Sequence, residues 1–114
     1  MLIKYKKSYE KIAMGLLSFM PKERTLKNLL QTMKQYNLAP DWQFYLWKYQ
    51  EDIIGLIGVE VKEDFVTVQH ASVNPSHRGE GVGRTMVEEI HRLMPHHKMR
   101  ATKETESFLL KCYK

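Results

Sequence analysis

Three glycines at alternate positions follow an arginine in the segment VNPSHRGEGVG. The glycines and the two arginines beside them are Arg78, Gly79, Gly81, Gly83 and Arg84. A strand-like apolar run precedes this segment, and a helix-like run follows it. The first amides of a helix have no partners within the helix and lie at the positive end of its dipole. Glycines here are expected to turn successive amides inward and let a phosphate group approach, with further contacts from the arginines.

Two common phosphate loops do not match this turn. A dinucleotide fingerprint needs the spacing G-x-G-x-x-G, whereas the glycines here follow G-x-G-x-G. A P-loop needs Gly-Lys-Ser or Gly-Lys-Thr, which the sequence lacks. A glycine-rich turn that binds no ligand remains an alternative at this point.

Composition restricts the classes of protein to which the chain could belong. The 114 residues are enough for one domain, which we expect to span 1–114, and a hydrophobic fraction of 43% is typical of a folded chain. Lysines and arginines exceed acidic residues by 18 to 13, which fits a polyphosphate ligand, a nucleic acid or simple solubility. The single cysteine, Cys112, can form neither an internal disulfide nor a zinc site of the usual kind, so we expect a cytoplasmic protein without a metal. No run is long enough to cross a membrane.

Strands and helices alternate along the chain. The patterns predict strands at 1–6, 42–50, 53–61, 65–73 and 97–101, and helices at 8–19, at 22–36, between the glycines and Pro95, and at 104–113. Ser8 is expected to cap the first helix. Three strands joined by short polar turns indicate an antiparallel meander, and the later strand–helix–strand crossover favours parallel pairing. The fold class is therefore α/β, a mixed sheet with helices on both faces.

The expected apolar faces of the helices follow helical spacing. In the first two helices they are formed by Ile12, Leu16, Phe19, Leu26, Leu29, Leu30, Met33 and Tyr36. In the helix after the glycines they are formed by Val82, Met86, Ile90 and Leu93.

The glycine segment resembles the acyl-CoA-binding motif of the GNAT family of N-acetyltransferases. That motif reads Arg/Gln-x-x-Gly-x-Gly/Ala, and Arg78, Gly81 and Gly83 satisfy it. The expected order of elements also resembles the GNAT fold along nearly the whole chain. The resemblance implies acetyl-CoA as acyl donor, bound by Ala71, Ser72, Val73, Arg78, Gly79, Glu80, Gly81, Val82, Gly83 and Arg84.

The resemblance also implies direct attack by a primary amine in a gap between the fourth and fifth strands, where the fourth often carries a bulge. Glu60 and His70 are the best candidates for the base that removes the amine proton. Each of them has a structural alternative, a solvent-facing glutamate or a packed histidine. Many family members protonate the leaving thiolate with a tyrosine on the last helix, but Leu109 or Leu110 stands near that place. Tyr113, one turn later, is a possible substitute.

The chain also departs from its relatives in length, because typical GNAT domains add two strands after the last helix. The strand at 97–101 is therefore expected to be an exposed edge, and either the acceptor site is open or a second subunit closes it in a homodimer. The acceptor is a small molecule or a protein, and we see no nucleic-acid module. A non-catalytic acyl-CoA-binding module is the alternative. The chain further resembles a small GNAT-type protein encoded with riboflavin-biosynthesis genes in Gram-positive bacteria.

Overall fold

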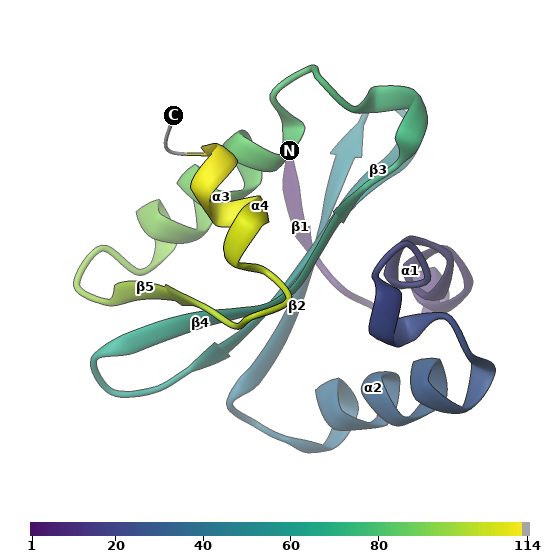
Figure 1. Ribbon diagram of the computed structural model, residues 1–114, viewed down its shortest axis with the longest axis horizontal. Helices are drawn as coiled ribbons and strands as arrows, with labels where there is room; N and C mark the ends of the chain where they lie inside the picture. Colours follow the sequence, from purple (N-terminus) through teal and green to yellow (C-terminus); the bar gives the residue numbers. More distant parts are fainter. Residues whose placement is uncertain (113–114) are drawn as a thin grey trace.

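The computed structural model describes residues 1–112 and forms one five-stranded sheet with helices on both faces (Figure 1). Its strands are β1 (Leu2–Lys4), β2 (Trp42–Tyr49), β3 (Asp52–Val61), β4 (Phe65–Val73) and β5 (Lys98–Ala101). Its α-helices are α1 (Glu10–Leu17), α2 (Leu26–Leu38), α3 (Val82–Leu93) and α4 (Glu106–Cys112). Three single 3₁₀ turns are η1 (Lys7–Tyr9), η2 (Pro21–Glu23) and η3 (Pro75–His77).

The strands lie side by side in chain order, β1-β2-β3-β4-β5. The first four are antiparallel to their neighbours, and β5 pairs parallel to β4 after the crossover through α3. The predicted mixed α/β sheet, including the meander and the parallel last pair, is therefore confirmed.

The sheet opens halfway along β4. Gly58 of β3 faces His70, while the next residue, Val59, faces Val68, so Gln69 is the extra residue of a β-bulge. β5 pairs with β4 only from Phe65 to Val68, and the following β4 residues have no β5 partner within residues 1–112. Thr105 lies at this opening, and its hydroxyl donates to the Val68 carbonyl at 2.7 Å. The gap expected between the fourth and fifth strands is thus present.

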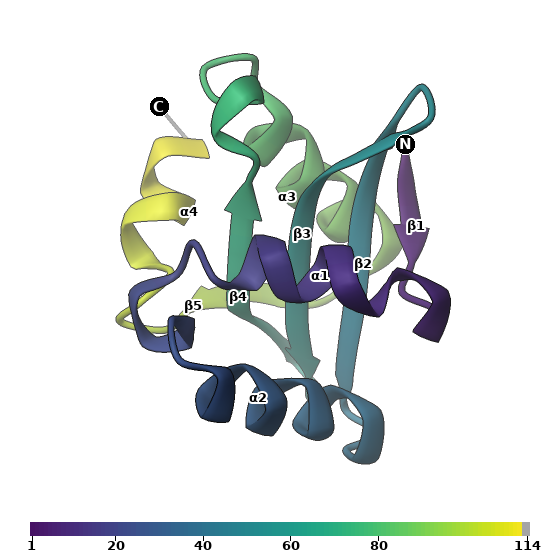
Figure 2. The same cartoon turned by 90° about the vertical axis from the view of Figure 1, so that its right-hand side faces the viewer.

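Each face of the sheet buries its own core. Figure 2 shows α1 and α2 in front of the sheet, and α3 and α4 lie on its other side. The residues packed between α3, α4 and the sheet include Ile57, Val66, Val68, Met86, Val87, Ile90 and Leu109. The residues packed beneath α1 and α2 include Ala13, Leu16, Leu17, Leu29, Met33, Tyr36, Phe44 and Leu56.

The first helix begins later than expected. Residues 7–9 form η1, and α1 begins at Glu10 with Tyr9 at its N-cap and no side-chain cap, so the prediction that Ser8 caps it is wrong. Ile12 and Phe19 are exposed, because the buried face of this short helix runs through Ala13, Leu16 and Leu17.

The second helix is displaced along the chain. Pro21 starts the separate turn η2, and α2 begins at Leu26 after Thr25, whose hydroxyl accepts the Asn28 amide at 3.2 Å. Of the predicted apolar stripe, Leu29, Met33 and Tyr36 are buried, whereas Leu26 and Leu30 are exposed. In the same way Val82, Met86 and Ile90 are buried in α3, whereas Leu93 is exposed. None of the helices within residues 1–112 is long and apolar enough to span a bilayer.

Candidate active site

The glycine turn joins β4 to α3 at the open half of the sheet. Gly79 and Gly81 have φ angles of +84° and +81°, a left-handed conformation that residues with a Cβ rarely adopt. Gly81 is also the N-cap of α3. No atom lies within 4 Å of where a Cβ would stand at either glycine, so both face open space. Open space therefore lies beside the N-terminus of α3, where the glycine pattern predicts that a phosphate approaches the first amides.

Gly83 has a packing role that the sequence pattern did not predict. A Cβ there would lie 2.8 Å from Cζ of Phe108, closer than real Cβ atoms approach their neighbours. Gly83 thus lets the Phe108 ring of α4 rest against the first turn of α3. This packing brings α4 beside the glycine turn and makes it one wall of the site.

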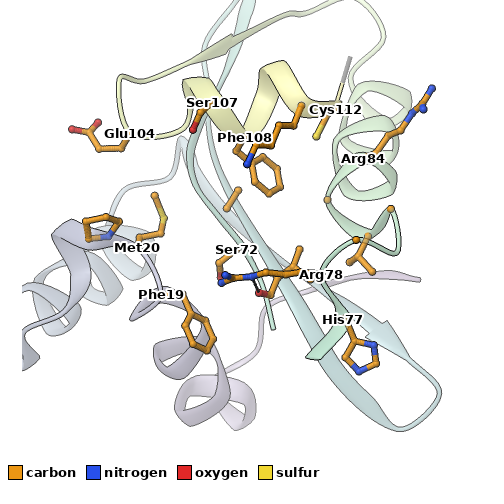
Figure 3. Close-up of a pocket in the computed structure, with 18 residues that line it drawn as sticks. Phe19, Met20, Ser72, His77, Arg78, Arg84, Glu104, Ser107, Phe108 and Cys112 are labelled. Carbon is orange, nitrogen blue, oxygen red and sulfur yellow. Dashed lines mark hydrogen bonds between the residues drawn. The ribbon is translucent and has the colours of Figure 1, made fainter. Parts of the chain in front are cut away.

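A groove of about 540 Å³, which we call the large groove, runs from the glycine turn along β4. Figure 3 shows side chains from the end of α1, from β4, from the glycine turn and from α4 around it. Its lining is formed by Phe19, Met20, Pro21, Ala71, Ser72, Val73, His77, Arg78, Gly79, Gly81, Val82, Gly83, Arg84, Glu104, Ser107, Phe108, Lys111 and Cys112.

This lining contains every predicted donor-binding residue except Glu80. The Glu80 carboxylate lies 3.1 Å from Nδ1 of His77 instead. The floor of the groove is Ala71, Ser72 and Val73, which belong to the half of β4 that β5 does not cover.

Basic side chains gather at the glycine end of the large groove. Arg78 is oriented by its Nε, which donates to the Val73 carbonyl at 3.1 Å, and its guanidinium lies 5.5 Å from the centre of the Phe19 ring. Lys111 of α4 and Arg84 of α3 also line the groove, and Nε of Arg84 donates to Oε1 of Glu88 at 3.1 Å. Positive side chains beside the N-terminus of a helix favour an anion such as a phosphate.

A second hollow of about 190 Å³, which we call the small cavity, lies next to the large groove. Its lining is formed by Met20, Pro21, Lys22, Glu23, Gln69, His70 and Glu104. Met20, Pro21 and Glu104 line both hollows, so they form a shared wall beside the bulge at Gln69. Two hollows that meet at the opening of the sheet provide separate places for two reactants.

Glu60, one of the predicted catalytic residues, is not placed at these hollows. The Glu60 carboxylate accepts a hydrogen bond from Nε2 of Gln69 at 3.1 Å and lies 3.5 Å from Nζ of Lys62, and Glu60 lines neither hollow. Tyr113 lies outside the described residues.

The third, His70, lines the small cavity inside a chain of hydrogen bonds. Its Nδ1 lies 2.6 Å from the Tyr36 hydroxyl, and its Nε2 lies 3.0 Å from Oε1 of Glu23. Burial lowers the pKa of the His70 imidazole, and the hydrogen bond and charge of Glu23 oppose that shift. Burial also raises the pKa of the Tyr36 hydroxyl well above its usual value. The chain therefore holds a neutral imidazole between a protonated phenol and a glutamate.

Cys112 is buried at the α4 wall of the large groove. Burial raises the pKa of its thiol, although the nearby charge of Arg84 opposes the shift. A thiol held in its protonated form is a poor nucleophile. Within residues 1–112, no group of three or more potential ligands from His, Cys, Asp and Glu could hold a metal ion.

Sequence reasoning missed Glu23, Thr32, Tyr36, Glu104 and Phe108. Glu23 and His70 are 47 positions apart, and only the fold of α1 and η2 over β4 brings them together. A glutamate next to lysine and arginine in a polar stretch gives no sign that it will be buried. The one available signal was Gly58, which is unusual inside a strand and marks the close approach of another group.

The comparisons with known proteins agree with this geometry. Residues 10–111 match the model of the family described as "Acetyltransferase (GNAT) family". An "Uncharacterized N-acetyltransferase in lysA 3'region" of Bacillus methanolicus is 54% identical over 113 residues, covering 98% of this chain and 94% of that protein.

Solved structures share the fold at low sequence identity. A possible acetyltransferase from Clostridium difficile 630 superimposes with a TM-score of 0.80 at 14% identity, over 99% of this chain and 85% of that one. The aminoglycoside acetyltransferase AAC(6')-Iy, solved with a CoA bisubstrate analogue, superimposes with a TM-score of 0.76 at 15% identity. The match covers 97% of this chain and 84% of that one. The chain therefore belongs to the GNAT family of N-acetyltransferases.

Proposed function

We propose that this enzyme transfers the acetyl group of acetyl-CoA to a primary amine by direct attack of the amine nitrogen. The observation that carries the proposal is the meeting of the large groove and the small cavity at the β4 bulge. One hollow ends at the glycine turn beside Arg78, and the lining of the other includes Glu23 and Glu104. Such a pair suits a phosphorylated donor and a cationic acceptor.

The large groove fits the donor in charge and in shape. The left-handed glycines leave space beside the first amides of α3, where the pyrophosphate of the donor would bind together with Arg78 and Arg84. The side of Ala71, Ser72 and Val73 that faces away from β3 is open to the arm of the donor, because β5 does not pair with this part of β4; on that side Arg78 takes the Val73 carbonyl. Backbone amides near the bulge would polarise the thioester carbonyl. AAC(6')-Iy, which shares the fold, was itself solved with CoA.

Direct transfer is also supported by the protonated state of Cys112, since an acyl-cysteine intermediate would need a thiolate. Among the predicted catalytic residues within 1–112, His70 is the one that lines the small cavity. We retain Glu60 and Tyr113 as weaker candidates for proton transfer.

Calorimetry with acetyl-CoA, followed by measurement of thiol release in the presence of primary amines, tests this function. We expect binding in the micromolar range and thiol release only when an amine is present. Absence of binding at millimolar acetyl-CoA would refute the donor assignment. Binding without release, over a broad panel of amines, would instead favour the non-catalytic alternative.

Three finer properties belong to the same proposal. We propose a cytoplasmic enzyme whose acceptor is a small molecule or a protein. The resemblance to the small GNAT-type protein RibT supports a genomic association with riboflavin synthesis. Unchanged flavin levels in a strain that lacks the gene would argue against a role in that synthesis.

We also propose a homodimer. β5 is the last strand of the sheet, and its exposed residues Lys98, Arg100 and Ala101 would contact a second copy. A partner there would add a wall near the small cavity, which the β5–α4 connection borders through Glu104.

A further inference from the structure

We propose that Glu23 is the proton acceptor for the attacking amine, with His70 and Thr32 as positioning residues that hold its carboxylate at the small cavity. The inference rests on the proposed transfer function and assigns a role within it. It starts from a carboxylate that sequence patterns did not indicate. It also changes the place of His70, which we named together with Glu60 as a candidate base.

Glu23 is almost fully buried, with 7% of its surface exposed, yet it lines the small cavity. The Thr32 hydroxyl lies 2.8 Å from both carboxylate oxygens, and Nε2 of His70 lies 3.0 Å from Oε1. No lysine or arginine pairs with Glu23 in the part of the chain that the structure describes. A buried carboxylate without a cation is costly, so a cationic group in the adjoining cavity would stabilise it.

The hydrogen-bond pattern fixes how His70 acts. An ionised carboxylate only accepts hydrogen bonds, so the network assigns the imidazole proton to Nε2, which donates to Glu23. Nδ1 then accepts from the Tyr36 hydroxyl. Both nitrogens of His70 are thus occupied by protein groups, and neither is left for the amine. His70 instead orients the carboxylate that faces the cavity.

The acceptor supplies the proton that this carboxylate takes. A primary amine is an ammonium at neutral pH and cannot attack until it loses a proton. Glu23 attracts the ammonium and takes one proton, leaving a neutral amine and a carboxylic acid. The nitrogen lone pair then forms the C–N bond to the acetyl carbon while the C–S bond breaks. The sulfur leaves with the bonding electrons and takes the second nitrogen proton, and Glu23 later releases its proton to water.

Other charged groups surround Glu23 without replacing it. Lys22 and Glu104 pair with each other at the mouth of the small cavity. The hydrogen bond from Lys22 lowers the pKa of the Glu104 carboxyl, which makes Glu104 a weaker base. Glu60 bonds to Gln69 on β4, and the Tyr36 hydroxyl faces His70 rather than Glu23. Glu23 is therefore the carboxylate that is both buried and available to the cavity.

The test compares Glu23→Gln with wild type for the fastest acceptor in a panel of tyramine, spermidine and lysine methyl ester. We expect kcat/KM for the amine to fall by about 100-fold or more, the usual contribution of a general base. Binding of acetyl-CoA, measured by calorimetry, should not change. Glu63→Gln is the matched control, because Glu63 lies in the exposed β3–β4 turn away from both hollows and should keep wild-type activity.

The pH profile separates proton transfer from a structural role. In wild type the reactive pair is ammonium and carboxylate, so kcat/KM should be level between the ionisation of the carboxyl and that of the amine. Glu23→Gln needs an amine that is already neutral, so its kcat/KM should rise about tenfold per pH unit up to the pKa of the amine. Tyr36→Phe and Thr32→Val keep the carboxylate and should retain the level profile.

Two results would overturn the inference while leaving acetyl-CoA binding intact. The first is a Glu23→Gln enzyme with wild-type kcat/KM and a level pH profile. The second is a wild-type enzyme that binds acetyl-CoA yet acetylates none of the panel amines up to pH 9, since no amine would then use the carboxylate. Loss of acetyl-CoA binding by the wild type would instead refute the donor site itself.

Discussion

Gly58 lies directly beneath Tyr36, so closely that a Cβ on Gly58 would stand 2.1 Å from the tyrosine hydroxyl oxygen. The Tyr36 ring stacks on Phe44 with 3.9 Å between ring centres, and its hydroxyl reaches Nδ1 of His70. A glycine in the middle of β3 therefore allows a residue of α2 to cross the sheet surface and contact β4.

Gly58→Ala should destabilise the protein and displace Tyr36 from His70. Overpacking of this kind costs about 1–3 kcal/mol, which should lower the melting temperature by several degrees. Gly15→Ala is the matched control, because no atom lies within 4 Å of its Cβ position on α1, and alanine there should raise stability by about 0.5–1 kcal/mol. Thermal denaturation of the two variants checks both signs. A melting temperature of Gly58→Ala equal to that of wild type would show that Tyr36 moves aside freely.

Gly81→Val should weaken acetyl-CoA binding by roughly tenfold. A side chain in the left-handed conformation costs about 1–2 kcal/mol, and a branched one also fills the open space beside the first amides of α3. Gly81→Asn should lose much less affinity, because asparagine tolerates this conformation. Calorimetry with acetyl-CoA measures both effects. Similar affinities of the Gly81→Val and Gly81→Asn variants would contradict the role given to backbone conformation.

Much of the fold could be predicted from the sequence because its signals are local. The apolar segments at 53–61 and 65–73 matched β3 and β4 closely, since short polar turns separate them from their neighbours. The helix starts were less accurate. Pro21 forms its own short turn, and the cap that decides where α2 begins is Thr25, one of several polar residues that could have filled that place.

The lining of the large groove was predictable for the same reason, whereas that of the small cavity was not. The glycine turn is one continuous segment, and its residues line one groove. The small cavity combines η2, the β4 bulge and the connection to α4. Glu23 and His70 meet there only because α1 packs across the sheet, and the Ser72 hydroxyl bonds to the Leu16 carbonyl at 2.7 Å to hold that crossing. The spacing of residues along the sequence does not predict such contacts.

Stability should fall as the pH is lowered through the titration of His70. Burial lowers the pKa of this imidazole in the folded protein, so the unfolded chain binds the proton first. Below about pH 6.5 the free energy of unfolding should therefore decrease, at a rate approaching about 1.4 kcal/mol per pH unit, until the folded protein also becomes protonated. Urea denaturation between pH 8 and pH 5 should show this slope in wild type and a smaller one in His70→Gln. Parallel curves would mean that His70 is not held neutral.

Tyramine should be acetylated faster than L-tyrosine. The two molecules differ by one carboxylate beside the amine, and the small cavity already contains Glu23 and Glu104. Bringing a third carboxylate next to them is unfavourable, since like charges placed together cost several kcal/mol, so we expect kcat/KM for tyrosine to be lower by roughly tenfold or more. Tyrosine methyl ester, which lacks that charge, is the control and should behave like tyramine. Equal rates for tyrosine and tyramine would show that the carboxylates do not face the acceptor.

The proposed homodimer makes a prediction about salt. The β5 edge carries Lys98 and Arg100, and His97 precedes it, so a symmetric contact between two copies of this edge brings like charges together. Salt screens such repulsion, with a Debye length of about 10 Å at 0.1 M. Sedimentation equilibrium at micromolar protein should therefore give the mass of two chains. The dissociation constant of the dimer should decrease as the salt concentration rises. The mass of one chain at every salt concentration would refute the dimer. The small cavity would then be open at the β5 edge, which favours a protein or another large acceptor over a small enclosed one.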